Sequence, residues 1–155
     1  MIIREMTESD LDAVLAIEIS LFSSEAWDRD GFLYEMNDNP YATVFVAWED
    51  DQVIGFVDLW IMYEQAQISD IAVSAVHQKQ GVGQQLMNKA IALAINKQCD
   101  VMSLEVRVSN DKAIALYQKN NFINAGLRKK YYADGEDAVL MVKSIGGLND
   151  TDIGN

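Results

Sequence analysis

A glycine-spaced run between a strand-like segment and an amphipathic helix constrains this sequence most. The run is Gln78-Lys79-Gln80-Gly81-Val82-Gly83-Gln84; it follows the strand-like residues 68–73 and opens a helix that begins near Gly81. Such a loop presents several backbone N–H groups toward one point, at the positive end of the helix dipole. This arrangement suits a phosphate group, and a tight strand-to-helix turn is the alternative interpretation.

The same run excludes two common nucleotide-binding motifs. No Gly-Lys-Ser or Gly-Lys-Thr follows it, so it is not a Walker loop. It lacks the third glycine of a dinucleotide-binding fingerprint. The residues that follow the run must therefore decide which phosphate compound it suits.

Length and composition indicate one globular domain. The chain has 155 residues, of which 50% are apolar, which is enough to bury a core. No apolar run approaches the length of a membrane span, and the N-terminus lacks a basic region followed by an apolar one, so we expect a cytoplasmic protein that does not bind a membrane. The single cysteine, Cys99, has no internal disulfide partner, and we interpret it as a small residue between a helix and a strand.

The formal charge of −12 argues against nucleic acid as a direct partner, because phosphate contacts need basic patches. An acidic protein attracts cationic ligands or peptides. Solubility alone is the other explanation of the same charge.

Hydrophobic periodicity predicts the order β-α-α-β-β-β-α-β-α-β-β. The first helix is capped at Thr7, and its expected apolar stripe is Leu11, Val14, Leu15 and Ile19. The predicted strands are residues 1–5, 42–48, 53–62, 65–73, 101–108, 123–131 and 138–142, and the other helices are residues 28–37, 81 onward and 110–120.

This order predicts an α/β fold with a mixed sheet of about seven strands and helices on both faces. The ends of the sheet are expected to be antiparallel hairpins, with a parallel pair in the middle. We expect residues 1–145 to form a single domain and residues 146–155 to be a flexible tail.

The element order and the pattern Gln78-x-x-Gly81-x-Gly83 resemble the GNAT acyl-CoA N-acyltransferases. Residues 104–110, 113–117, 128–132 and 136–138 are similar to the RimI branch, whose members acetylate the N-terminal alanine of a small-subunit ribosomal protein. The resemblance covers roughly residues 1–145. Two departures are Asn121-Phe122, where relatives have Gly-Phe, and Ala26-Trp27-Asp28, where they often have Pro-Trp-Ser.

The resemblance implies acetyl-CoA as the co-substrate. Its pyrophosphate would lie on the N–H groups of the loop, and its pantetheine arm would pair with the preceding strand, which in this family diverges from its parallel neighbour. A strand amide would polarise the thioester carbonyl. The implied cofactor-binding residues are Ile71, Ala72, Val73, Lys79, Gln80, Gly81, Val82, Gly83, Gln84 and Asn110.

Glu105 is the leading candidate for the general base. It shares one face of its strand with Ser103 and Arg107, where a charge needs a partner or a cleft. One interpretation is an internal Glu105–Arg107 pair. The other, which the resemblance supports, is a base that takes a proton from the incoming amine, directly or through water.

Tyr117 is the candidate general acid, because a phenol and a thiolate have neighbouring pKa values of about 10 and about 8.5. A core tyrosine packed against Ile114 is the alternative. Asn110 is expected both to cap this helix and to bond the cofactor.

The chemistry favours an α-amine as acceptor, since its pKa is about 7.7–8.0 against about 10.4 for lysine. The acceptor peptide is expected between the Trp27 region and Tyr131-Tyr132. Acidic residues that would attract a basic peptide, or simply form a solvated surface, are Glu25, Asp28, Asp30, Glu35 and Glu64. The single histidine, His77, excludes a histidine-rich metal site, and the expected reaction needs no metal.

The sequence therefore predicts an N-terminal alanine acetyltransferase that acts on the basic N-terminus of a ribosomal protein, as a monomer or weak dimer. An acetyltransferase of lysine or of a small amine is the nearest alternative. A CoA-sensing module without turnover is the alternative from another class, and the presence of both Glu105 and Tyr117 argues against it.

Overall fold

The structure, a computed structural model, describes residues 1–22 and 26–146 and has the predicted order of elements. The strands are β1 (Ile2–Glu5), β2 (Ala42–Glu49), β3 (Gln52–Met62), β4 (Gln65–Val73), β5 (Val101–Arg107), β6 (Ile123–Arg128) and β7 (Ala138–Ser144). The α-helices are α1 (Leu11–Phe22), α2 (Arg29–Asn37), α3 (Val82–Asn96) and α4 (Asp111–Lys119). Two short 3-10 helices, η1 (Glu8–Asp10) and η3 (Ala75–His77), complete the set.

The strands form a seven-stranded mixed sheet in the order β1-β2-β3-β4-β5-β7-β6. Strand pairs β1/β2, β2/β3, β5/β7 and β6/β7 are antiparallel, while β4 and β5 are parallel and pair from Gln65–Gln67 with Val101–Ser103. The predicted fold class, with antiparallel ends and a central parallel pair, is confirmed.

The chain divides into two compact units. The first unit comprises Met1–Trp60 with Ile68–Ala90, and the second unit comprises Ile61–Gln67 with Ile91–Asn155. The expectation that residues 1–145 act as a single domain stays a prediction.

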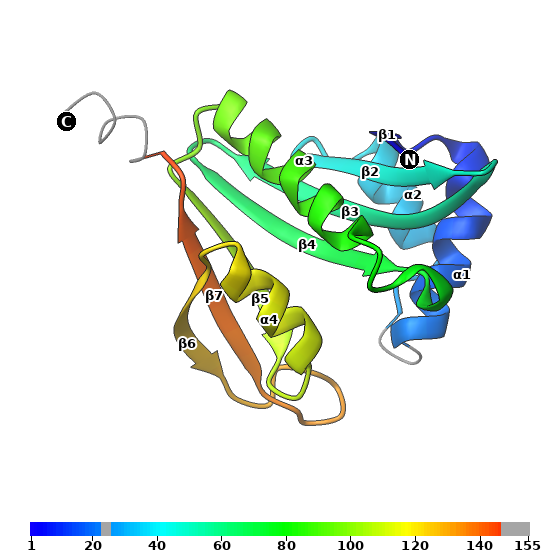
Figure 1. Cartoon of the computed structure of the whole chain (residues 1–155). Helices are drawn as coiled ribbons and strands as arrows, with labels where there is room; N and C mark the ends of the chain where they lie inside the picture. Colours follow the sequence, from blue (N-terminus) through cyan, green and yellow to red (C-terminus); the bar gives the residue numbers. More distant parts are fainter. Residues whose placement is uncertain (23–25, 147–155) are drawn as a thin grey trace. The chain divides into compact units, whose positions relative to one another are not determined.

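In the first unit, helices cover both faces of the strands (Figure 1). On one face, Val44, Val46 and Phe56 pack with the buried residues of α1 and α2. On the other face, a Cβ atom added at Gly55 would lie 3.2 Å from Leu86 Cδ1 of α3 and 2.9 Å from the carbonyl oxygen of Ala72. A glycine at this position therefore lets α3 and β4 approach the centre of β3 closely.

The stripe predicted for the first helix is partly wrong. Leu11 and Val14 are buried, but Ile19 is 58% exposed and Ile17 is 7% exposed in its place. The helix is preceded by the 3-10 turn η1, so the α-helical repeat begins only at Leu11. Val14 and Ile17, three and six positions beyond Leu11, face the core, and the side of the helix that carries Ile19 faces solvent.

The boundaries of the last two strands also differ from the prediction. Strand β6 ends at Arg128 rather than at Tyr131, because Lys130 takes a left-handed backbone (φ 52°) and donates its N–H to Asp137 Oδ1 at 2.8 Å. Strand β7 continues to Ser144, after which Ile145 is buried and the N–H of Gly146 donates to the Asp100 carbonyl at 3.0 Å. The expected tail thus has an anchored first residue, and residues 147–155 lie outside the described part of the chain.

Two carboxyl groups are buried in the first unit without a cation between them. Asp58 of β3 is fully buried beside Glu35 and Trp60. Glu35 of α2 accepts from Trp60 Nε1 at 2.5 Å and from Asn39 Nδ2 at 2.8 Å. Burial raises the pKa of Asp58 to about 9, and a hydrogen bond to Glu35 and the charge of Glu35 raise it further. Asp58 therefore carries a proton at neutral pH and shares it with Glu35.

This proton predicts how stability varies with pH. Between pH 6 and 8 the folded chain holds a proton on Asp58 that the unfolded chain, with a pKa near 3.8, has lost, so the free energy of unfolding falls as the pH rises. We expect Asp58→Asn to reduce this slope by up to about 1.4 kcal/mol per pH unit. Chemical denaturation at several pH values measures it. Asp51→Asn, in the exposed β2–β3 turn, is the control and should keep the wild-type slope; an unchanged slope in Asp58→Asn would show that Asp58 is ionised.

Candidate active site

The glycine loop is tied to the strand that precedes it. Gln78, the first residue of the motif, donates from Nε2 to the Val73 carbonyl at 3.2 Å, at the end of β4. Lys79 and Gly81 both take left-handed backbone conformations, with φ of 65° and 83°. Left-handed residues in close succession turn the backbone N–H groups inward, as in an anion-binding nest. The first N–H groups of α3, which begins at Val82, have no intrahelical acceptor and extend this donor set.

Gly81 is required for its backbone conformation. A Cβ atom at this position would meet nothing within 4 Å in the protein, so space does not exclude a side chain. Its φ of 83° is unfavourable for any residue with a Cβ. The structure thus brings the predicted residues Lys79 to Gln84 together at one helix N-terminus, with Gly83 in the first turn.

The three predicted residues of β4 differ in what their backbone groups do. The N–H of Ile71 is hydrogen bonded to the carboxyl group of Asp70. The carbonyl of Val73 accepts from Gln78. Ala72 is buried and Ile71 is half-buried. Ala72 and Val73 are therefore the better candidates for the amide that meets a thioester carbonyl.

Glu105 lies in the second unit on the half-buried face of β5, as predicted, and it contacts Arg128 and Gln67. Its Oε2 is 2.6 Å from Arg128 Nε, and its Oε1 accepts from Gln67 Nε2 at 3.4 Å. Its side chain is 14% exposed, while that of Arg128 is 51% exposed. Glu105 thus has a partner on β6 that the sequence did not indicate, and the Glu105–Arg107 pair stays a prediction. The carboxylate lies close to the surface, beside the more exposed guanidinium group of Arg128.

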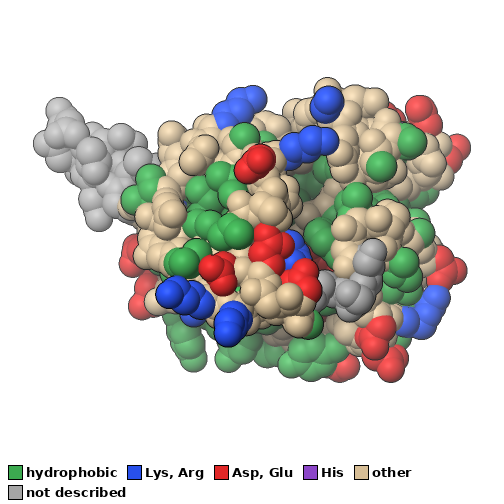
Figure 2. Space-filling view, turned by 90° about the horizontal axis from the view of Figure 1, so that it is seen from below, with side chains coloured by type: hydrophobic (Ala, Val, Ile, Leu, Met, Phe, Trp, Pro, Cys, Tyr) green, Lys and Arg blue, Asp and Glu red, His purple; other side chains and the backbone are tan. Residues whose placement is uncertain are grey.

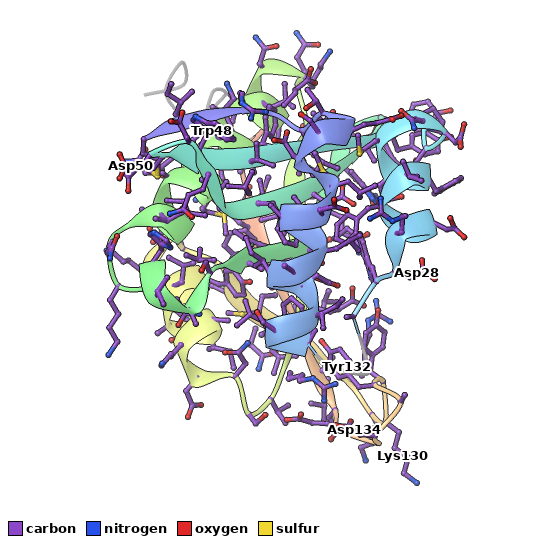
Figure 3. All side chains as sticks on the ribbon, turned by 90° about the vertical axis from the view of Figure 1, so that its right-hand side faces the viewer. Asp28, Trp48, Asp50, Lys130, Tyr132 and Asp134 are labelled. Atoms are coloured by element: carbon purple, nitrogen blue, oxygen red, sulfur yellow. The ribbon has the colours of Figure 1, made fainter. Side chains whose placement is uncertain are left out.

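Arg107 organises the loop between β6 and β7. Its Nη1 lies 2.9 Å from Asp134 Oδ2 and 2.9 Å from Glu136 Oε1, and its guanidinium stacks 4.0 Å from the centre of the Tyr132 ring. Figure 3 shows Tyr132, Asp134 and Lys130 together in this loop. The hydrogen bond from Arg107 to Glu136 is the main cause that raises the pKa of Arg107. Arg107 therefore holds the β6–β7 loop in place.

The two predicted tyrosines of this loop have different environments. Tyr131 is 50% exposed and its hydroxyl is hydrogen bonded to Glu105; burial, followed by the charge of Glu105, raises its pKa. Tyr132 is half-buried, and burial raises its pKa to about 12. Their rings meet edge-on at 5.1 Å. Tyr131 is thus the one placed to contact a group that approaches Glu105.

Tyr117 is 6% exposed in α4, and its ring lies 6.0 Å from that of Phe122. The helix begins as predicted, since Asn110 Oδ1 accepts from the Ala113 N–H at 3.2 Å. It ends with Asn121 in the left-handed conformation (φ 69°), which explains how asparagine replaces the glycine of relatives. The aromatic contact is what a core tyrosine makes, and the role of general acid stays a prediction.

Trp27 is held by its backbone as well as its ring. Its N–H donates to Glu18 Oε2 at 2.8 Å, and its ring packs 5.3 Å from Phe32. Of the acidic residues expected to attract a peptide, Glu35 is buried and is therefore wrong as a surface charge. Asp28 caps α2 by accepting from the Gly31 N–H at 2.8 Å, Asp30 and Glu64 are exposed, and Glu25 lies outside the described residues.

Acidic and basic side chains alternate in small groups on the face drawn in Figure 2. Within residues 1–22 and 26–146, no helix has the length and apolar character needed to cross a membrane. The same residues contain no group of three or more His, Cys, Asp or Glu side chains placed to hold a metal ion.

Sequence reasoning missed Arg128 and Gln67 as partners of Glu105. Gln67 reaches Glu105 because β4 pairs in register with β5 at Gln67 and Ser103, two residues before Glu105 on the same face. Arg128 of β6 reaches Glu105 of β5 across the face of β7, which lies between these two strands. The order and register of strands produce both contacts, and no local spacing in the sequence reports them.

Comparison with known families gives one clear match. The model described as the acetyltransferase (GNAT) family matches residues 11–122. A Bacillus subtilis protein named as a candidate ribosomal protein bS18-alanine N-acetyltransferase is 41% identical over 140 residues, which are 90% of this chain and 92% of that protein. The Escherichia coli ribosomal protein bS18-alanine N-acetyltransferase is 34% identical over 104 residues, which are 65% of this chain and 70% of that enzyme.

Solved structures agree with this match. The crystal structure of the ribosomal-protein-S18-alanine N-acetyltransferase from Escherichia coli has a TM-score of 0.83 at 29% identity and covers 93% of both chains. The crystal structure of Ard1 from Thermoplasma volcanium has a TM-score of 0.83 at 27% identity, covering 93% of this chain and 97% of that one.

The conformation of Gly81 predicts a defect in cofactor binding. Gly81→Ala should raise the KM for acetyl-CoA about fivefold or more, because a left-handed alanine costs about 1 kcal/mol or more of strain in the loop. Initial rates at varied acetyl-CoA measure it. Gly126→Ala is the matched control: its Cβ would also meet nothing within 4 Å, and Gly126 lacks a positive φ. Equal KM values in the two variants would contradict the anion-cradle interpretation.

The contacts of Glu105 allow a controlled test of its role as base. Glu105→Gln removes the basic group and should lower kcat by about a hundredfold or more, with little change in the KM for acetyl-CoA. Arg128→Gln breaks the same Glu105–Arg128 pair but leaves the carboxylate, so its loss of kcat should be much smaller. Steady-state kinetics of both variants decide the matter. Similar losses in both would mean that Glu105 acts only by holding β6.

Proposed function

Because the chain belongs to the acetyltransferase (GNAT) family, we propose that it transfers the acetyl group of acetyl-CoA to the α-amine of an N-terminal alanine on a small-subunit ribosomal protein. The observation that carries the proposal is the 41% identity, over 90% of the chain, to a relative named for this reaction on ribosomal protein bS18. The candidate base at Glu105 and the anion cradle at Lys79 to Gln84 fit the same chemistry.

The loop and strand of the first unit are proposed to bind acetyl-CoA. The donors of the cradle and the positive end of the α3 dipole suit the pyrophosphate, and Lys79 adds a positive charge that is exposed at the rim. The exposed edge of backbone in β4 suits the amides of pantetheine, with Ala72 or Val73 donating to the thioester carbonyl. Asn110 is proposed as a further contact. Acetyl-CoA supplies an activated acetyl group as its thioester.

The chain's own residues are proposed to manage two protons. Glu105, acting directly or through a water molecule, accepts the proton that the α-amine loses when the nitrogen bonds to the acetyl carbon. Tyr117 donates its phenolic proton to the sulfur that leaves. A lysine acceptor would need roughly three more pKa units of deprotonation, on the order of 4 kcal/mol, so a single carboxylate serves an α-amine better.

The acceptor is proposed to be a basic protein N-terminus that contacts Trp27, Tyr131 and Tyr132. The net charge of −12 favours encounter with such a peptide and disfavours direct contact with ribosomal RNA. We place the reaction in the cytoplasm, where ribosomal proteins are made, and propose a monomer or weak dimer that needs neither a metal nor a membrane.

Mass spectrometry of peptide products tests the proposal. Basic peptides that begin with alanine are incubated with acetyl-CoA beside peptides of the same sequence with a blocked N-terminus and one internal lysine. Acetylation of the alanine amine at a rate at least about tenfold higher than that of lysine is expected from the lower pKa of the α-amine. Faster modification of the blocked lysine peptides would overturn the proposal and favour the lysine alternative.

A further inference from the structure

A second pair of buried carboxyl groups lies in the first unit, away from Glu105 in the sequence and unused by the proposed reaction. Glu18 of α1 is 1% exposed, and its Oε2 accepts from the Trp27 N–H at 2.8 Å. Its Oε1 and the Oδ2 of Asp70 in β4 are buried, and neither has a donor in the described part of the chain. Two acceptor atoms buried in this way need a proton between them.

The surroundings of the pair explain why one proton stays. Burial, the hydrogen bond to Glu18 and the charge of Glu18 all raise the pKa of Asp70 well above its usual value. The charge of Asp58 from β3 also acts on Asp70, and Glu35 from α2 acts in turn on Asp58. Within residues 1–22 and 26–146, neither Glu18 nor Asp70 forms an ion pair with a lysine or arginine. Two carboxyl groups that share a hydrogen bond cannot both ionise without a large cost.

The pair also joins two backbone segments. Asp70 accepts from the N–H of Ile71, and Glu18 accepts from the N–H of Trp27. A continuous series of hydrogen bonds therefore runs from the Trp27 backbone through Glu18, the shared proton and Asp70 to the Ile71 backbone. Ile71 directly precedes Ala72 and Val73, the candidate contacts of the thioester.

We propose that Glu18 and Asp70 are positioning residues that share one proton. Together they hold the backbone at Trp27 at a fixed place relative to β4. Because Trp27 is a proposed contact of the acceptor peptide, this inference rests on the proposed function. A buried carboxyl pair is more costly than apolar residues of the same size, so its presence is better explained by positioning than by stability. At alkaline pH the shared proton is lost and the two carboxylates repel each other. The hydrogen bond from the Trp27 N–H to Glu18 then weakens.

Two variants of one residue separate positioning from folding. Glu18→Gln keeps an oxygen for the Trp27 N–H and supplies an amide N–H for Asp70, so it replaces the shared proton. Glu18→Met has a similar volume and makes neither bond. Glu8→Ala removes an exposed carboxylate from the turn before the same helix and is the control.

The first readout is the KM of each substrate. We expect Glu18→Met to raise the KM of the acceptor peptide about tenfold, as for loss of a hydrogen bond to a charged group, with less than about a twofold change in the KM for acetyl-CoA. Glu18→Gln should restore the acceptor KM. The wild-type acceptor KM should also rise at alkaline pH relative to that of Glu18→Gln. Equal acceptor KM values in all variants at every pH would overturn the proposal, as would parallel changes in both KM values and in Tm.

The second readout needs no acceptor. Hydrogen exchange of the Trp27 amide, followed by NMR, should be about tenfold faster in Glu18→Met than in the wild type, and close to the wild type in Glu18→Gln and Glu8→Ala. Unchanged exchange in Glu18→Met would refute the positioning role even if alanine peptides are acetylated. Faster exchange in a protein that acetylates no alanine peptide would support the pair and reject the proposed function instead.

Discussion

The burial of β3 on both faces is the constraint on which the first unit depends. Helices α1 and α2 cover one face and α3 covers the other, so each residue from Val53 to Leu59 must fit against a packed neighbour. Only glycine fits at position 55, because a Cβ atom there would lie 2.9 Å from the carbonyl oxygen of Ala72. Asp58 fits only as a neutral acid, because a buried carboxylate without a cation is too costly. The same packing sets the place where α3 begins, and with it the anion cradle.

Carboxyl groups in this protein serve three different purposes, and their partners decide which. Glu105, the proposed base, lies near the surface against Arg128 and Tyr131. Asp134 and Glu136 meet Arg107, which holds the β6–β7 loop. The backbone N–H of Glu136 and then Arg107 lower the pKa of Asp134, and Ser109 and then Arg107 lower that of Glu136. Asp58 and Asp70 of the first unit lie against other carboxyl groups, and burial raises the pKa of both. An overall charge of −12 conceals these differences.

Periodicity was sufficient to predict most elements, because each strand or helix with one buried face repeats its apolar residues at a fixed interval. The strand Gln65–Val73 has the predicted bounds, and the caps at Asp28 and Asn110 make the expected bonds. The wrong predictions concern which side of α1 is buried and where the last strands end, and the contact of Glu105 with Arg128 was not predicted. The exposure of Ile19 depends on how α1 packs, and the contact of Glu105 depends on strand order. Neither is a property of the local residues.

The sequence by itself determined the glycine loop, the helix it opens and the face of β5 that carries Glu105, because backbone conformation and periodicity are local properties of the chain. Only the tertiary structure decided which charged groups meet. Arg128 stands 23 positions after Glu105, and Asp70 stands 52 positions after Glu18, so their contacts depend on strand order and on helix packing. Burial then decided protonation, since the energy of a charge depends on what surrounds it and not on its place in the sequence.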